Sequence, residues 1–168
     1  MQGQIFSAPI NAANNAALRN NKGIMYMEMG YYNAAVNEFK IAIALNPNSL
    51  ASATYYNNLG NLYFKVQDYR NARDCYKQAI RLNPVFLTYY RNLIKLYDKQ
   101  GTLKQELQTQ LAKIQADNKN SDAILYAGLS YAQLGNKKEA VNYLKKYTEL
   151  EKEQLLSNSV NLYIKELE

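Results

Sequence analysis

Apolar and polar residues follow one another along the chain with helical spacing, in blocks that short polar turns separate. In the first block the apolar positions predict one helix over about residues 17–29 and a second over about 34–45, with a turn at Gly30 between them. The second helix should end before Pro47, because the residue that precedes a proline is pushed out of helical geometry. Helices joined by so short a turn lie side by side and antiparallel. The pattern therefore predicts a helical hairpin.

This block recurs along the chain at a nearly constant interval. Its most regular residue is a tyrosine, which returns after steps of 37, 34 and 34 residues as Tyr26, Tyr63, Tyr97 and Tyr131. Small residues and prolines keep the same register: Gly23, Gly60 and Gly128; Gly30, Gly101 and Gly135; Ala35, Ala72 and Ala140; Pro47 and Pro84. So many coincidences in one register indicate a repeated helical pair.

The small residues have a physical role, because two helices approach closely where glycine or alanine leaves room and bulky side chains fill the space beside them. We therefore expect the small residues of each pair to face one another: Gly23 with Ala35, Gly60 with Ala72, and Gly128 with Ala140. The expected fillers are the four spaced tyrosines together with Tyr32, Phe39, Tyr69, Tyr76 and Leu144. We interpret the tyrosines as core residues and not as a cofactor site.

These columns resemble the tetratricopeptide-repeat family, whose unit of about 34 residues carries small, large and proline positions in the same places. The resemblance covers about residues 16–152 and is strongest from Tyr55 to Tyr63. It implies an all-α fold, a right-handed alpha-alpha superhelix of four helix-turn-helix repeats. The expected repeats are residues 16–49, 53–86, 87–120 and 121–152, after an N-terminal flexible segment at residues 1–15.

The third repeat departs from the family pattern. Ile94 stands where the small residue is expected, and Asn118 replaces the proline. Glu106 and Lys113 replace alanines. Apolar residues still recur with helical spacing, so we interpret this unit as a looser repeat. The longer first step adds three residues near 48–52, which predict either a longer turn or one more helical turn.

The last segment, residues 153–168, carries apolar residues on one helix face. They are Leu156, Val160, Tyr163 and Leu167. An end repeat exposes an apolar flank unless something covers it, so the segment is predicted to be a C-terminal capping helix. The alternative is a helix that binds a partner or a second copy of the chain.

Composition narrows the range of functions. The 168 residues carry a net charge of +6, but the lysines are spread along the chain without the arginine clusters of a nucleic-acid site, so no nucleic-acid partner is expected. The chain has no histidine and one cysteine, Cys75, which disfavours acid–base catalysis and a zinc site. We expect no enzyme activity, no cofactor and no metal.

Membrane insertion is not expected, because no apolar run approaches the roughly 20 residues that span a bilayer. The first residues do not resemble a signal peptide. A single cysteine fits a cytoplasmic location. An exported chain whose signal has been removed would show the same pattern.

Resemblance to the family also implies where a partner would bind, because the first helix of each repeat lines the concave side of the superhelix. The main groove residues implied in this way are Asn21, Asn58, Asn61, Lys65, Arg91, Asn92, Lys95 and Lys99, followed in the fourth repeat by Asp122, Leu125, Tyr126, Leu129 and Gln133. Asn21, Asn58 and Asn92 form one column, and their amides could hold a peptide backbone. The alternative is that these asparagines only reflect the abundance of asparagine in the chain and its frequency in that column of the family.

Arg91, Lys95 and Lys99 are four residues apart and form a basic stripe, which Lys65 of the neighbouring repeat joins. The stripe either binds acidic side chains or is a plain solvated face. The clamp with which some family members hold chaperone tails is not expected. Asn20, Thr88 and Asn92 stand where that clamp has basic residues.

Together these features predict a non-enzymatic protein–protein interaction module whose groove binds an extended or helical segment of a partner, with an acidic segment favoured. The alternatives are a self-assembling homo-oligomeric scaffold and a regulatory fragment of a larger enzyme. We expect a monomer or a weak homo-oligomer.

Overall fold

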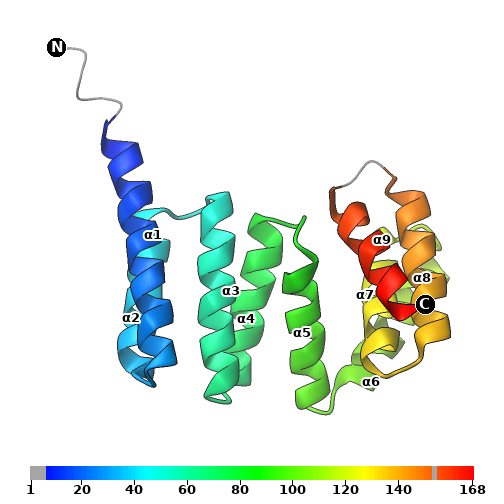
Figure 1. The fold of residues 1–168 in the computed structure, drawn as a ribbon. Coiled ribbons are helices and arrows are strands. Elements are labelled where there is room, and N and C mark those ends of the chain that lie inside the picture. The colour runs from blue at the N-terminus through cyan, green and yellow to red at the C-terminus, as the bar shows by residue number, and fades with distance from the viewer. Residues whose placement is uncertain (1–6, 153–154) are drawn as a thin grey trace. The chain divides into compact units, whose positions relative to one another are not determined.

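The computed structural model describes residues 7–152 and 155–168, which form nine helices and no strand (Figure 1). The chain divides into two compact units, one up to Asn83 and the other from Pro84 to Glu168. We name them unit 1 and unit 2 and describe each by itself. The all-α architecture of helical pairs that the repeat pattern predicted is confirmed.

Unit 1 consists of two helical pairs. Its helices are α1 (Ser7–Glu28), α2 (Tyr32–Leu45), α3 (Leu50–Lys65) and α4 (Tyr69–Leu82). α1 packs along α2 and α3 packs along α4, while α3 also contacts α2 and so joins the two pairs (Figure 1). These pairs are the first two repeats, in the register that the sequence predicted.

Two helices of unit 1 differ from the prediction in length. α1 begins at Ser7, so the part of the expected flexible segment from Ser7 onward is helical, and residues 1–6 lie outside the described part of the chain. The early start has two reasons: Pro9 falls in the first turn, where a proline is tolerated, and an alanine-rich stretch follows. α3 has 16 residues against 13 in α5 (Leu87–Lys99), so the extra residues of the first step form one more helical turn.

Unit 2 contains a loose pair and a tight pair. Its helices are α5 (Leu87–Lys99), α6 (Leu103–Ala116), α7 (Ser121–Gln133), α8 (Lys137–Leu150) and α9 (Leu155–Leu167). α7 and α8 pack along one another like the pairs of unit 1. α5 and α6 meet only over a short stretch, α6 packs mainly on α7, and α5 also contacts α7 and α9. The third repeat is therefore looser, as its sequence predicted.

The tyrosine column marks the end of the first helix in every repeat. Each tyrosine carbonyl accepts a hydrogen bond of 2.8 or 2.9 Å from the main-chain amide five residues later. The donors are Tyr31, Asp68, Thr102 and Asn136. The residue before each donor has a positive φ, and these residues are Gly30, Gln67, Gly101 and Gly135. Glycine suits this position because it has no Cβ atom to strain the backbone.

Three repeat glycines lie against large side chains. A Cβ atom placed on any of them would stand 2.7 or 2.8 Å from a side chain of the second helix of its pair. The contacts are Gly23 with Phe39, Gly60 with Tyr76, and Gly128 with Leu144. The side chains nearest to these glycines belong to the large residues four positions after the expected alanines. The alanines Ala35, Ala72 and Ala140 are fully buried.

The predicted fillers divide into two groups. Phe39, Tyr76, Tyr97 and Leu144 are buried. Tyr26, Tyr32, Tyr63, Tyr69 and Tyr131 are only half-buried. A tyrosine has an apolar body and a polar tip, so its ring can pack while its hydroxyl stays in water. Most of the tyrosine column therefore borders the core instead of filling it.

α9 forms where a C-terminal capping helix was predicted, and it packs on α8 and reaches α5. Leu156, Val160 and Ile164 of α9 are buried. Tyr163 and Leu167 are half-buried. The contact with α5 places α9 beside the candidate site.

Candidate functional site

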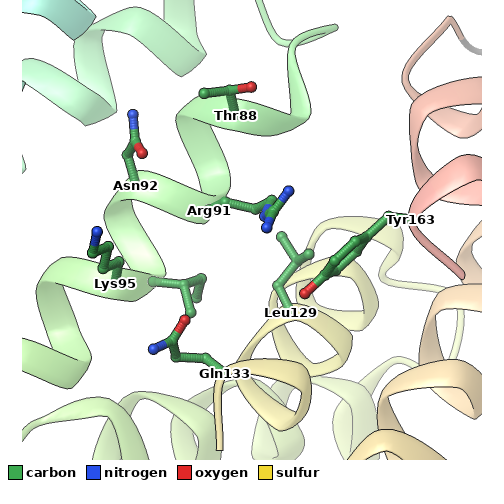
Figure 2. A pocket seen from close by; sticks show the side chains of 8 residues that line it. Thr88, Arg91, Asn92, Lys95, Leu129, Gln133 and Tyr163 are labelled. Carbon is green, nitrogen blue, oxygen red and sulfur yellow. The ribbon is translucent and has the colours of Figure 1, made fainter. Parts of the chain in front are cut away.

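A pocket of about 220 Å³ opens between α5, α7 and α9 of unit 2 (Figure 2). Its lining residues are Thr88, Arg91, Asn92, Ile94, Lys95, Leu129, Gln133 and Tyr163. Pockets that bind drug-sized molecules measure about 300–1,000 Å³. This pocket is below that range and has room for one side chain of a partner.

α5 supplies the charged rim of the pocket. Thr88, Arg91 and Lys95 share one face of α5, because residues three or four apart lie on the same side of a helix. The Arg91 and Lys95 side chains are exposed. The opposite face of α5 is anchored in the core of unit 2 by buried Leu93 and Leu96. The two positive charges are thus held on a fixed helix while they stay in contact with water.

The floor of the pocket is apolar. Ile94 and Leu129 are only 3% and 2% exposed. At one end, Gln133 Nε2 donates a hydrogen bond of 2.8 Å to Asp98 Oδ2 and ties the end of α7 to α5. The exposed Asp98 carboxylate is a negative charge one turn beyond Lys95 on α5.

α9 contributes one wall of the pocket, which the sequence did not predict. The guanidinium carbon of Arg91 lies 4.4 Å from the centre of the Tyr163 ring, over the ring face, and Figure 2 shows the side chain directed toward it. The sequence placed Tyr163 on the apolar face of α9 as a packing residue. No local sequence pattern could reveal this cation–π contact, because it joins two helices that are far apart in the chain.

The pocket brings together Arg91, Asn92 and Lys95 of the predicted groove residues, and α7 adds the predicted Leu129 and Gln133. Lys99, the last residue of α5, is exposed but is not among the lining residues.

Two further groove predictions for α7 do not hold. Leu125 is 1% exposed and therefore belongs to the core of unit 2. The Tyr126 ring packs on the Tyr90 ring with centroids 5.6 Å apart, and burial, with a smaller effect of the Tyr90 charge, raises the pKa of Tyr126. These two side chains are used for packing because α5 lies against α7 here.

In unit 1, two predicted groove asparagines are engaged within the unit. Asn58 Nδ2 donates a hydrogen bond of 2.9 Å to Asn20 Oδ1, which links α3 to α1. Asn61 Oδ1 accepts a hydrogen bond of 2.9 Å from the Tyr76 hydroxyl, which links α3 to α4. Both amides therefore help to hold the repeats together.

The other two groove residues predicted in unit 1 are exposed. Asn21 lies on α1, and Lys65 ends α3 with its Nζ atom 5.9 Å from the centre of the Tyr32 ring. The predicted column of Asn21, Asn58 and Asn92 contains residues of both units. It stays a prediction.

A cluster of one buried carboxylate, Glu38, and two partly exposed cations, Arg19 and Lys22, ties α1 to α2 in unit 1. The Glu38 carboxylate is 3.0 Å from Arg19 Nη1 and 3.0 Å from Lys22 Nζ. The hydrogen bond from Lys22, with a smaller one from Arg19, holds the pKa of Glu38 below its usual range, although burial acts in the opposite direction. All three side chains belong to one helical pair, so we assign the cluster to stability.

A second, acidic pocket of about 140 Å³ lies at the other end of α7 and includes Asp122 and Glu151 in its lining. Tyr90 and Tyr147 also line it. Burial above all, and then the charge of Asp122, raises the pKa of Tyr90. The two ends of α7 therefore carry pockets of opposite charge.

The single cysteine of the chain, Cys75, lies in the core of unit 1. Cys75 is 8% exposed, and burial, followed by the charges of Asp74 and Asp68, raises the pKa of its thiol to about 12. A thiol with so high a pKa is protonated at neutral pH and is a poor nucleophile. Within residues 7–152 and 155–168, no three His, Cys, Asp or Glu side chains are placed to hold a metal ion. No helix of the described chain has the length and apolar character needed to cross a membrane.

Sequence models described as tetratricopeptide repeat match residues 53–86 and 122–151, and one described as TPR repeat matches residues 23–67. No curated protein matches the sequence. Among solved structures, the crystal structure of MamA is 30% identical, covers 83% of this chain and 80% of MamA, and has a TM-score of 0.51.

Two further solved structures share the fold at lower identity. Pseudomonas aeruginosa PilF is 19% identical and covers 94% of this chain and 69% of its own, with a TM-score of 0.55. A tetratricopeptide repeat protein from Parabacteroides merdae is 18% identical and covers 92% of this chain and 60% of its own, with a TM-score of 0.54. The matching family models and the likeness to MamA support a protein-interaction scaffold, a class of protein that is generally non-catalytic.

Proposed function

Because the chain belongs to the tetratricopeptide-repeat family of protein-interaction scaffolds, we propose that it binds an acidic peptide segment of a partner protein at the pocket of unit 2. The observation that carries the proposal is the position of Arg91 and Lys95 on the rim of one pocket with Asn92. The partner is a protein and the interaction is non-catalytic.

The chemistry of the rim suits a carboxylate. A guanidinium presents its N–H donors in a planar fork that matches the two carboxylate oxygens, and a lysine adds a second positive charge. Hydrogen bonds to charged groups contribute about 1.5–3 kcal/mol each. The amides of Asn92 and Gln133 can donate to and accept from a peptide backbone. An acidic segment therefore finds partners for both its side chain and its main chain.

The charged residues of α5 together also favour a negatively charged ligand. On α5, Arg91, Lys95 and Lys99 outnumber the single carboxylate of Asp98. A basic segment would be repelled by the three cations of this stripe. Asp98 weakens the positive field at one end, where it accepts the hydrogen bond from Gln133.

The central test removes both rim charges, in a double variant with Arg91→Ala and Lys95→Ala. Binding of a fluorescein-labelled Gly-Ser peptide with a run of glutamates should weaken at least about tenfold, because two charge-assisted contacts are lost. Raised salt should weaken binding to the unaltered protein as well. Fluorescence anisotropy on the full chain measures both effects.

The matched control removes the same charge elsewhere, through Lys137→Ala with Lys138→Ala in the exposed first turn of α8. The control variant should bind the peptide as the unaltered protein does. If both double variants lose equal affinity, the attraction comes from net charge and the assignment to the pocket is wrong.

Lys99 of unit 2 has a secondary part in binding, because it would attract an acidic segment from a distance. The groove roles of Asn21, Asn58, Asn61 and Lys65 in unit 1 stay predictions. Single substitutions of these residues by alanine should weaken peptide binding by less than the loss of Arg91. If any of them causes a larger loss of peptide affinity than the substitution of Arg91, the assignment of the binding site to the pocket is wrong.

A second candidate function is self-assembly through the N-terminal face of unit 1. On α3, Tyr55 and Leu62 are 6% and 0% exposed, because the preceding repeat covers them. Leu18 and Met25 hold the equivalent positions of α1 and are 65% and 45% exposed. Such an apolar end can stack on a second copy. Light scattering that gives the monomer mass at every concentration would exclude this candidate.

A further inference from the structure

α9 has a fixed place beside the pocket. Leu156, Val160 and Ile164 hold the helix in the core of unit 2. At its end, Lys145 Nζ of α8 pairs with Glu168 Oε1 at 2.7 Å. A helix held at several points along its length can support a binding residue as well as cover a repeat end.

Tyr163 acts on Arg91 through its ring face. A cation over an aromatic ring is attracted by the π electrons, and the ring carries no formal charge that would neutralise it. The contact at 4.4 Å therefore restrains the Arg91 side chain and preserves its positive charge. A free arginine side chain loses rotamer entropy when it binds a ligand, and a restrained one loses less.

We propose that Tyr163 is a positioning residue that holds Arg91 ready to bind one glutamate side chain of the partner, which makes α9 part of the binding site. The inference rests on the proposed function of the same pocket. Glutamate fits better than aspartate because its longer apolar stem can contact Ile94 and Leu129 on the pocket floor while its carboxylate reaches the rim. The pocket volume of about 220 Å³ suits one such side chain.

The first experiment compares two replacements of Tyr163 by anisotropy with the same glutamate peptide. Tyr163→Phe keeps the aromatic ring and should bind as the unaltered protein does. Tyr163→Leu keeps an apolar side chain without a ring and should weaken binding about two- to fivefold, the range expected for an exposed cation–π contact. Equal affinities of the Phe and Leu variants would overturn the proposal.

The second experiment repeats Tyr163→Leu in a protein that already carries Arg91→Ala. If Tyr163 acts through Arg91, the second substitution should change the affinity by less than about twofold, because the group that it positions is gone. A loss of the same size in both backgrounds would show a merely structural role and overturn the proposal. Thermal melts of all variants check folding, and Tyr163→Met is the second variant should the Leu variant be unfolded.

The third experiment varies the ligand. Peptides of the same length with aspartate, glutamine or phosphoserine in place of glutamate should all bind more weakly than the glutamate peptide, and blocking the peptide C-terminus as an amide should change nothing. Tighter binding of phosphoserine or loss of binding on amidation would overturn the assignment to a glutamate side chain.

The outcomes also separate this inference from the proposed function. If the double variant of Arg91 and Lys95 binds the peptide normally, the pocket is not the site and the proposed function fails with the inference. If that variant loses binding while Tyr163→Leu does not, the function stands and only the role of Tyr163 is wrong.

Discussion

The helical pairs of the second and third repeats pack differently, and the two repeats also differ at the position of the small residue in the first helix. Gly60 lets α3 and α4 approach so closely that the Tyr76 ring fills the space a Cβ atom would need. Ile94 holds the same column on α5 and is buried, and there α5 and α6 meet only over a short stretch. A large side chain in place of a glycine thus accompanies the change from a tight helical pair to a loose one.

The loose pair is also the one that carries the candidate site. α5 contacts α7 and α9 in addition to α6, and Ile94 itself lines the pocket between these helices. The regular repeats of unit 1 use Asn58 and Asn61 to join helices to one another. The repeat that departs from the pattern is therefore the one whose first helix lines the pocket of unit 2.

The largest expected effect comes from Gly60→Leu. The new Cβ atom would stand 2.7 Å from the Tyr76 ring and 3.2 Å from the Cys75 Cβ atom, so the α3–α4 pair must move apart. Overpacking of this kind costs about 1–3 kcal/mol of unfolding free energy. Urea unfolding followed by circular dichroism measures it. A variant as stable as the unaltered protein would refute the packing role of Gly60.

The substitution Ile94→Leu on α5 places a leucine at the position in the loose pair that is equivalent to Gly60. It should cost less than about 1.5 kcal/mol, because the volume of the side chain is unchanged. The same urea experiment compares it directly with Gly60→Leu. If the two variants lose equal stability, the contrast between the two repeats does not arise from this column.

The turns offer a smaller comparison between the units. Gln67 has a φ of 63° at the position where unit 2 has Gly101 with a φ of 74°. Gln67→Gly should stabilise unit 1 by about 0.5–1 kcal/mol, because relief of the left-handed strain exceeds the added freedom of the unfolded chain. Gly101→Ala should act in the opposite direction. A lower melting temperature for Gln67→Gly would contradict the argument.

The smallest expected effect concerns pH. The pKa of Glu38 is lowered in the folded chain, so its stabilisation is complete above the ordinary carboxyl pKa of 4.5 and is lost as the pH falls through the lowered value. Glu38→Gln should therefore reduce stability at pH 7, and this reduction should become smaller as the pH falls below the ordinary carboxyl pKa of 4.5. Glu168→Gln, which breaks the exposed pair with Lys145, should change stability by less than about 1 kcal/mol. Equal effects of the two variants would show that burial does not distinguish these pairs.

The sequence was sufficient for the helices, because their ends depend on local chemistry. In the structure α5 is Leu87–Lys99 and α7 is Ser121–Gln133, and both lie within the repeats 87–120 and 121–152 that the glycine turns and the apolar spacing predicted. The start of α1 at Ser7 was missed, because a proline such as Pro9 can lie either in the first turn of a helix or outside a helix, and the sequence alone does not distinguish the two.

The candidate site was predictable only in part. Arg91, Asn92 and Lys95 followed from their spacing on one helix and from the family resemblance. The contact of Arg91 with Tyr163 could not follow, because it depends on how α9 packs across unit 2. The core position of Leu125 was missed for the same reason: the close approach of α5 to α7 is a tertiary property.

Cys75 gives unit 1 an internal reporter of its own opening. It is the single cysteine of the chain, and in the closed α3–α4 pair its thiol is buried, with a pKa of about 12. The thiolate of an accessible cysteine adds to the double bond of a maleimide reagent, so alkylation of Cys75 at neutral pH should require that the α3–α4 pair separates. The labelling rate then measures how often the α3–α4 pair opens, because unit 2 contains no cysteine. Gly60→Leu should make the labelling faster.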